Sequence, residues 1–541
     1  MAKQDGIYAE KLEDVPVLLI SGTGGAYTIR GKDLENSLFD SEKREEIIKS
    51  YYIQNDKCLV PEKAYYYKGN EKKYLLRKTQ SNYPPLVTRT LENILEKNNL
   101  EFESIPCDTI WEKREFTLKH YKCVCLSTTF MWSEKMIDVA IKWILSNTVS
   151  DYIVLGGHYS SIKYEYILYK YPAVNYIIIG DGEKALPMLL KKLLGELNVE
   201  LLDIPNIAYL QNNILEKSAM KYEDMNNIEK VSYEGKYERL SYESVRGCAY
   251  GCKFCTWDAG IKCFRYKSAE RIVSDVKEYI EENGIKRIEI NDSTFFFPFS
   301  RIEKVVDGFI DLGIHWKAHC RADVPWTDEL IDKLNRSNCD ILQIGFESMC
   351  DRILCNMDKR TTCEMNRFTN EMLSKTKIDT VVSFIVGFPD ETVEEFKYTW
   401  DYILNDFSGH FYLFVFEMED KSLELYKERK KYGFELFEDK EDCLHGGSHW
   451  RHNGMTSDEA FELRSSVLKS VRINNSRAIY KSWQSPYEWP FVPEMTRAEN
   501  IYIERLLDNL IFAIQDVDER IVKEYVQDIV CKLGEKGVFF D

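Results

Sequence analysis

Three cysteines in one short segment carry the residue pattern with the most specific chemistry in this chain. The segment RGCAYGCKFCTW places Cys248, Cys252 and Cys255 at the spacing C-x3-C-x2-C. Three thiolates this close in sequence can wrap one inorganic centre from a single loop, and the small Gly247 and Gly251 let the loop curl around it. A [4Fe–4S] cluster takes one ligand per iron, so three cysteines leave one iron open for a substrate or cofactor.

Three other interpretations of these cysteines were weighed. Three cysteines in eight positions amid polar and glycine residues do not resemble a core segment. A zinc site with Cys263 or a distant histidine as the fourth ligand stays open, although zinc commonly takes two separated pairs of ligands. A four-ligand electron-transfer cluster also stays open. We favour the cluster with one open iron, because the spacing agrees with the strand–loop–helix setting.

The cysteine loop resembles the signature of the radical S-adenosylmethionine (SAM) superfamily, in which an aromatic residue precedes the third cysteine, as Phe254 does here. Later stretches resemble the second to fifth strands of the same superfamily, and the resemblance covers residues 240–405. Asp292, at the end of the second strand, is a lesser candidate for the site. The stretches are IEIND (288–292), HCRAD (319–323), DILQIGFES (340–348) and FIVGFPDET (384–392).

The resemblance implies that SAM chelates the open iron and is cleaved reductively to a 5′-deoxyadenosyl radical, which abstracts hydrogen from substrate. It places Phe254 near the adenine, and Gly387 packed against it. It places Glu347 and Ser348 against the ribose or the amino acid part of SAM. Arg321 would pair with the SAM carboxylate, a task that suits a guanidinium. The alternative for Glu347 and Arg321 is a salt bridge within the barrel.

The N-terminal part resembles the cobalamin-binding domain that precedes many radical SAM modules. The resemblance rests on VLLI, YPPL, VLGGH and IIIGDGEKAL, within residues 15–200. Such domains hold cobalamin through backbone and small residues, which here are Gly156, Gly157, Gly180 and Gly182. The motif Asp-x-His-x-x-Gly is absent, so no cobalt ligand is named. The resemblance therefore implies a bound cobalamin, and the alternative is a domain of the same type that binds none.

Alternating apolar strands and amphipathic helices predict an α/β chain of three parts. A Rossmann-like, doubly wound domain is expected at 15–215, with an insertion at about 31–80. A run of βα units over 236–430 predicts a partial (β/α)6-type TIM barrel, the radical SAM core. An α-rich C-terminal domain is expected at 435–541, where Thr456 begins a capping box.

Composition narrows the class of protein. The net charge of −17 argues against a nucleic-acid partner, because proteins that bind phosphates normally carry a basic surface. No run of eighteen apolar residues is present, so no membrane span is expected. Fifteen cysteines behind an N-terminus that lacks a signal peptide predict a reducing, cytoplasmic location.

The remaining cysteines were considered as a second cluster or as hydrogen donors. Only Cys443 and Cys531 follow the barrel, too few for an auxiliary cluster. Donation of hydrogen to a substrate radical by one cysteine near a strand end, as in peptide epimerases, is the alternative, and a small buried thiol is the favoured interpretation of each. The candidates are Cys320, Cys350, Cys355 and Cys363.

The sequence therefore predicts a radical SAM enzyme that modifies an unactivated carbon of a peptide or natural product and needs a low-potential electron donor. Methylation through cobalamin is the favoured reaction, and cobalamin-independent epimerisation or rearrangement is the alternative. A non-catalytic iron–sulfur or zinc module is the alternative of another class. Methylthiolation of tRNA is disfavoured, because N-terminal cysteines at a cluster spacing and a basic RNA-binding appendage are both missing.

Overall fold

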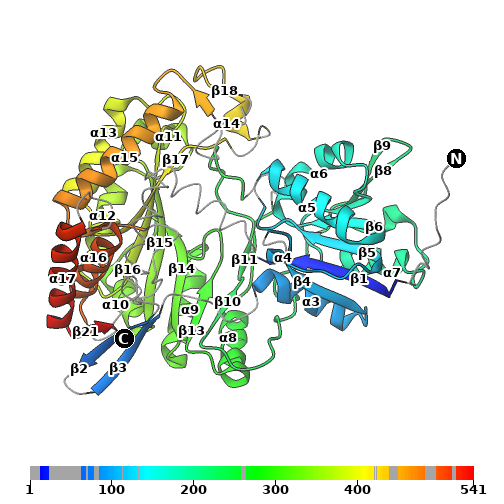
Figure 1. Ribbon diagram of the computed structural model, residues 1–541, viewed down its shortest axis with the longest axis horizontal. Coiled ribbons are helices and arrows are strands. Elements are labelled where there is room, and N and C mark those ends of the chain that lie inside the picture. Colours follow the sequence, from blue (N-terminus) through cyan, green and yellow to red (C-terminus); the bar gives the residue numbers. More distant parts are fainter. Residues whose placement is uncertain are drawn as a thin grey trace. The chain divides into compact units, whose positions relative to one another are not determined.

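The computed structural model places most of the chain in two compact units (Figure 1). The first unit comprises residues 1–29 and 84–234, and the second comprises 30–83 and 235–541. The residues described are 12–22, 63–68, 71–77, 85–111, 114–131, 133–257, 263–418, 421, 423–437, 449–481, 495–513 and 519–540.

The first unit is built on a seven-stranded sheet in the order β4-β1-β5-β6-β7-β8-β9. The first five strands in this order are parallel to one another. At one edge, β8 pairs antiparallel with β7, and β9 pairs antiparallel with β8. The chain order reverses between β1 and β5, the switch point at which doubly wound sheets bind ligands. The strands are β1 (Asp14–Ser21), β4 (Phe102–Pro106), β5 (His120–Ser127), β6 (Val149–Gly156), β7 (Tyr176–Ile178), β8 (Ile207–Gln211) and β9 (Ile214–Lys217).

Both faces of this sheet are buried, because successive side chains of a strand point to opposite sides. In β1, Leu18 and Ile20 enter one apolar core, and Val17 and Leu19 enter the other. Helices supply the outer half of each core. They are α3 (Leu86–Lys97), α4 (Asp108–Trp111), α5 (Glu134–Asn147), α6 (His158–Lys170) and α7 (Ala185–Leu193), with a 3-10 turn at Leu201–Asp203.

The second unit contains a parallel seven-stranded sheet in the order β10-β13-β14-β15-β16-β17-β20. The first six strands alternate with helices, so the expected partial (β/α)6 barrel is confirmed. The strands are β10 (Arg239–Tyr242), β13 (Arg287–Ile290), β14 (His315–Arg321), β15 (Cys339–Glu347), β16 (Asp379–Val386), β17 (Gly409–Val415) and β20 (Ala478–Tyr480).

Local sequence signals begin and end the barrel helices where expected. The Ser268 side chain accepts a hydrogen bond from the Arg271 amide, and Gly284 ends the same helix in a left-handed conformation. Thr456 and Glu459 form the expected capping box. The helices are α8 (Ala269–Asn283), α9 (Phe299–Leu312), α10 (Asp328–Arg336), α11 (Asp351–Asn356), α12 (Cys363–Ser374), α13 (Val393–Asn405), α14 (Glu424–Lys427), α15 (Ser457–Asn474), α16 (Arg497–Ala513) and α17 (Glu519–Glu535).

The described strands of the later chain and of the expected insertion pair as follows. β20 pairs with β17 and extends the barrel sheet. The expected insertion at 31–80 contributes two described strands, which group with the barrel unit. Its strands β2 (Lys63–Lys68) and β3 (Glu71–Arg77) form a sheet with β21 (Val538–Phe540) near the C-terminus. In the first unit, β8 and β9 form a hairpin, and the unit ends at Glu234.

Two short pairs of strands complete the second unit. β11 (Val245–Arg246) and β12 (Arg265–Tyr266) flank the cysteine loop. β18 (Glu435–Phe437) pairs with β19 (His449–Arg451). Among the described residues, no helix has the length and apolar character needed to cross a bilayer.

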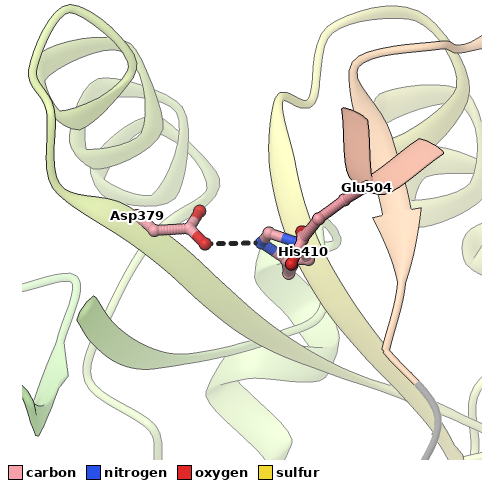
Figure 2. A group of neighbouring side chains, drawn as sticks. All are labelled: Asp379, His410 and Glu504. Carbon is pink, nitrogen blue, oxygen red and sulfur yellow. Dashed lines mark hydrogen bonds and ion pairs between the residues drawn. The ribbon is translucent and has the colours of Figure 1, made fainter. Parts of the chain in front are cut away.

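A buried ion network joins α16 to the beginnings of β16 and β17 (Figure 2). The imidazole of His410 lies between two carboxylates: Nδ1 is 2.8 Å from Asp379, and Nε2 contacts Glu504. Three such donors are also a set that divalent cations use. Arg497, 3.9 Å from Asp379, and the buried Lys481 lie beside the same groups. The two carboxylates favour the protonated form of His410.

This network predicts a pH-dependent stability of the barrel unit. Burial alone lowers the pKa of His410, but Asp379 and Glu504 outweigh burial and raise the pKa above its ordinary value. The stabilisation is therefore complete below pH ~6.5 and is lost as the pH rises through the folded-state pKa. His410→Gln should cost roughly 3–5 kcal/mol in slightly acidic buffer and less in alkaline buffer. Thermal unfolding of both proteins across pH checks this, and a difference that grows with pH would contradict it.

Candidate active site

The cysteine loop lies between β11 and β12, and its three thiols are partly buried. Burial raises the pKa of Cys248 and raises that of Cys255 to about 12. The charge of Cys252 adds to burial in raising both pKa values. None of the three is in a disulfide. Three neighbouring thiols of this kind fit a [4Fe–4S] cluster, whose iron atoms would displace the thiol protons.

Residues that follow β13 hold the start of this loop. The fully buried carboxylate of Asp292 accepts hydrogen bonds from the backbone amides of Ser244 (2.7 Å) and Val245 (3.0 Å), and from the Ser244 hydroxyl. Ser293 Oγ donates to the carbonyl of Gly247 at 2.6 Å. Burial raises the pKa of Asp292 to about 6. Asp292 therefore fixes the backbone that precedes the first cysteine.

The backbone at Cys263 packs closely against Gly247, at the start of the loop. Gly247 has φ +74°, and a Cβ there would lie 2.5 Å from the carbonyl oxygen of Cys263. Only glycine fits this close approach in this conformation. Later in the loop, the amide of Lys253 donates to the carbonyl of Met357, and its ammonium group pairs with Glu428 at 2.9 Å. The segment that carries the three thiols is thus anchored at both ends.

Arg321, the last residue of β14, lies directly beside the thiols. Its guanidinium stacks over the Tyr250 ring at 3.7 Å and donates to the sulfur of Cys252 at 3.7 Å. It also pairs with Asp323 at 3.0 Å and donates to the carbonyl of Lys359. The guanidinium of Arg321 thus lies next to the proposed cluster site. The alternative expected for Arg321, a salt bridge within the barrel, is formed as well, with Asp323.

Glu347 and Ser348 occupy the end of β15 with their side chains already bonded. Glu347 forms a buried ion pair with Lys359 at 2.9 Å and accepts from Ser383 Oγ at 3.2 Å. Ser348 is fully buried, and its hydroxyl accepts from the amide of Cys350 at 3.1 Å. In this structure Ser348 therefore serves the turn after β15, whereas Glu347 presents a neutralised carboxylate at the strand end.

Phe254 and the loop after β16 meet beside the cysteines. The rings of Phe254 and Phe388 are 6.2 Å apart and edge to face. Gly387 has φ +83°, and a Cβ on it would lie 2.4 Å from the Trp450 ring and 3.0 Å from Ala460. The residues expected around the adenine are thus brought together. The free side of Gly387, however, is covered by Trp450 of the later chain.

In the first unit, the four predicted glycines follow the carboxyl ends of β6 and β7. Gly156 ends β6, and Gly157 caps α6. A Cβ on Gly157 would lie 2.7 Å from the backbone of Thr129, so this glycine is required by the packing of two loops. At Gly182 a Cβ would make an ordinary contact, 4.0 Å from the side chain of Ile178. Gly180 follows β7 with φ +74°.

Comparison with known families agrees with this site. Residues 242–403 match the sequence model of the radical SAM superfamily. This part of the chain is a radical SAM domain. The match includes the three cysteines, Arg321 and Glu347. The recognition drawn from the cysteine loop is confirmed.

Two curated relatives of the chain are a methyltransferase and a cyclase. The chain is 28% identical to a bacteriochlorophyllide d C-12(1)-methyltransferase of Chlorobaculum tepidum over 208 residues, which are 37% of this chain and 45% of the relative. It is 22% identical to an anaerobic magnesium-protoporphyrin IX monomethyl ester cyclase of Rubrivivax gelatinosus over 295 residues, 51% of this chain and 52% of the relative. The chain thus spans about half the length of these curated relatives.

The same architecture occurs in solved structures. The radical SAM methyltransferase TsrM of Kitasatospora setae, solved with cobalamin and a [4Fe–4S] cluster, superposes with a TM-score of 0.57 at 13% identity. That match covers 85% of this chain and 98% of TsrM. The cobalamin-dependent SAM radical enzyme OxsB gives 0.52 at 17% identity, over 84% and 82% of the two chains. At these identities the likeness establishes the fold, including that of the first unit.

The other cysteines divide by their burial. Burial raises the pKa values of Cys320 and Cys339, as expected for core thiols, and raises that of Cys363 to about 12. Cys355 is exposed, and the buried sulfur of Cys350 lies 4.0 Å from a carboxylate oxygen of Glu395. Cys443 lies outside the described residues.

Sequence reasoning missed the partners of the predicted site residues. Lys359 neutralises Glu347 from twelve residues away, and Tyr250 stacks beneath Arg321. Neither pair has a fixed spacing that a pattern would reveal. Tyr250, however, stands within the cysteine loop itself, two residues before Cys252, where an aromatic side chain could have been noted.

Proposed function

We propose that this protein cleaves SAM reductively at a [4Fe–4S] cluster held by Cys248, Cys252 and Cys255, and uses the resulting radical to modify an unactivated carbon. The single observation that carries the proposal is the C-x3-C-x2-C loop, with three free and partly buried thiols, inside a radical SAM domain. When bound, the cluster supplies the electron that cleaves the sulfonium bond of SAM. Oxidised cluster and SAM alone do not complete this step, so a low-potential electron donor is part of the proposal.

The residues around the thiols bind and orient SAM in this proposal. Arg321 is one cation for the SAM carboxylate, because it already lies beside Cys252 and its guanidinium has further donors. Glu347 lies at a strand end on the same edge of the sheet and would accept hydrogen bonds from the hydroxyls or the ammonium group of SAM. Phe254 and Phe388 offer an apolar edge for the adenine. These groups orient the cofactor and exclude water, while the cofactor supplies the chemistry.

We further propose cobalamin-dependent C-methylation of a peptide or other natural product. The first unit has the doubly wound order whose switch point, between β1 and β5, is a ligand site in such sheets. The glycine loops after β6 and β7 lie at the carboxyl edge of this sheet, and cobalamin domains of this kind hold the cofactor through backbone and small residues. Support also comes from the methyltransferase TsrM, which was solved with cobalamin, and from the bacteriochlorophyllide methyltransferase.

The test separates the two levels of the proposal. The protein is purified anaerobically, its cluster is reconstituted, and it is mixed with hydroxocobalamin before desalting. The absorbance spectrum should then show a cobalamin band beside the iron–sulfur absorption, with about one cobalamin per chain by cobalt analysis. Iron–sulfur absorption without cobalt would overturn the methylation proposal and favour cobalamin-independent hydrogen transfer, such as epimerisation. A protein that holds no cluster and cleaves no SAM would overturn the radical SAM activity itself.

A further inference from the structure

His452, in the segment between β19 and α15, is bonded to the loop after β16 at both of its ring nitrogens. Nε2 lies 3.2 Å from the carbonyl oxygen of Gly387. Nδ1 lies 3.2 Å from the amide of Asp390, 3.0 Å from that of Gly454 and 3.3 Å from that of Met455. The ring therefore connects two ends of the loop 387–390 to a turn in the later chain.

The partners decide the protonation state of this ring. Three backbone amides can only donate, so Nδ1 must accept and carries no proton. A carbonyl can only accept, so the proton is on Nε2, which donates to Gly387. Burial lowers the pKa of His452 to about 4, in agreement with a neutral ring. A single tautomer thus satisfies every contact that the imidazole makes.

Packing locks the same ring in place. His452 is stacked on Trp450 with ring centres 5.0 Å apart and an interplanar angle of 10°. Trp450 Nε1 donates to the carbonyl of Phe416 at 2.8 Å, which fixes the indole over β17. A Cβ on Gly454 would lie 2.0 Å from the carbonyl oxygen of Glu391, so the turn lies directly against the loop after β16.

The loop that His452 holds reaches the cysteines. It contains Phe388, whose ring contacts Phe254, the residue directly before the third cysteine. A shift of the carbonyl of Gly387 would move Phe388 with it, because they are adjacent residues. A movement of the segment that holds His452 would therefore also move Phe388 relative to Phe254, the two rings proposed to contact the adenine.

We propose that His452 is a positioning residue for SAM: its neutral imidazole sets the loop 387–390 at the distance from the cysteine loop that SAM binding requires. It touches neither the cluster nor the reacting atoms. The inference rests on the proposed function, since it assigns the loop a role in holding SAM. It adds a residue from outside the matched radical SAM domain, which ends at residue 403.

Two substitutions of His452 distinguish the role of Nδ1 from that of Nε2. In His452→Asn the side-chain oxygen can take the place of Nδ1 and keep the amides of the turn, but the side chain is too short to reach Gly387. In His452→Gln the amide nitrogen can reach the carbonyl of Gly387. His449→Asn is the matched control, because His449 is on the same short chain segment, is about one-third exposed, and lies 3.9 Å from Asp458.

The measurement is SAM cleavage by the reconstituted holoenzymes, resolved into KM for SAM and kcat, together with iron content and Tm. We expect His452→Asn to raise KM by about three- to ten-fold with unchanged iron content, the loss of one hydrogen bond. His452→Gln should recover most of this loss, and His449→Asn should match the wild type. If the Asn variant does not fold, His452→Leu, which retains packing on Trp450, replaces it and should raise KM at least as much.

Three results would contradict either the positioning role of His452 or the proposed function. A KM for SAM unchanged in the Asn or Leu variant would overturn the positioning role. An equal rise in the Gln and Asn variants would also overturn it, because only the filling of space would then matter. A wild-type protein that carries its cluster but does not cleave SAM would contradict the proposed function instead, before any variant is compared.

Discussion

Replacing Cys255 with alanine should lower the rate of SAM cleavage by at least about a hundred-fold. Loss of a residue that merely supports a metal ligand costs up to ~100-fold, so loss of a ligand itself should cost more. The remaining two thiols hold only two irons of a four-iron cluster, and the protein should lose iron during desalting. The measurement is 5′-deoxyadenosine formation by the reduced, reconstituted variant, with iron and sulfide content determined on the same sample.

Cys363→Ala is the control for this variant. Cys363 is a partly buried cysteine of the same unit, at the start of α12, and has no place in the proposed cluster. It should keep full iron content and cleavage activity. A Cys255→Ala protein that retained a [4Fe–4S] spectrum and cleaved SAM at the wild-type rate would exclude this thiol as a ligand and would reopen the interpretation with Cys263.

Substituting Gly387 with alanine should destabilise the barrel unit by roughly 2–5 kcal/mol. The left-handed backbone at φ +83° accounts for about 1–2 kcal/mol. The new methyl group would lie 2.4 Å from the ring of Trp450, and overpacking of this kind typically costs ~1–3 kcal/mol. Thermal unfolding followed by circular dichroism should show the transition at a clearly lower temperature.

Gly313→Ala isolates the contribution of the clash. Gly313 ends α9 with φ +63°, and a Cβ there meets nothing within 4 Å. Its alanine variant should therefore show the backbone strain alone, about 1–2 kcal/mol. Equal destabilisation of the two variants would mean that Trp450 moves aside at no cost, and the close packing on the loop after β16 would then be irrelevant to stability.

The parts of the fold that sequence predicted well are those determined by local signals. The strand Arg287–Ile290 and the helix between Ser268 and Gly284 lie where their apolar period and capping residues indicated. The cysteine spacing likewise led directly to the radical SAM domain. Each of these signals is contained within fewer than twenty residues, so the chain needs no distant partner to reveal it.

The parts that sequence did not predict depend on contacts between distant residues. The strand β20 is only three residues long, and its membership of the barrel sheet follows from pairing with β17, about seventy residues earlier. The pairing of β2 with β21 joins residues 64 and 540. Likewise, the Lys359 partner of Glu347 and the hold of His452 on Gly387 are visible only when the chain is folded.

The most direct test of the account is whether the protein cleaves SAM. Anaerobically reconstituted wild-type protein is incubated with SAM and a strong reductant, and 5′-deoxyadenosine and methionine are quantified over time. The account predicts that 5′-deoxyadenosine accumulates only when iron, reductant and Cys248, Cys252 and Cys255 are all present. A protein that holds a full [4Fe–4S] cluster, is reduced, and yields no 5′-deoxyadenosine would contradict it.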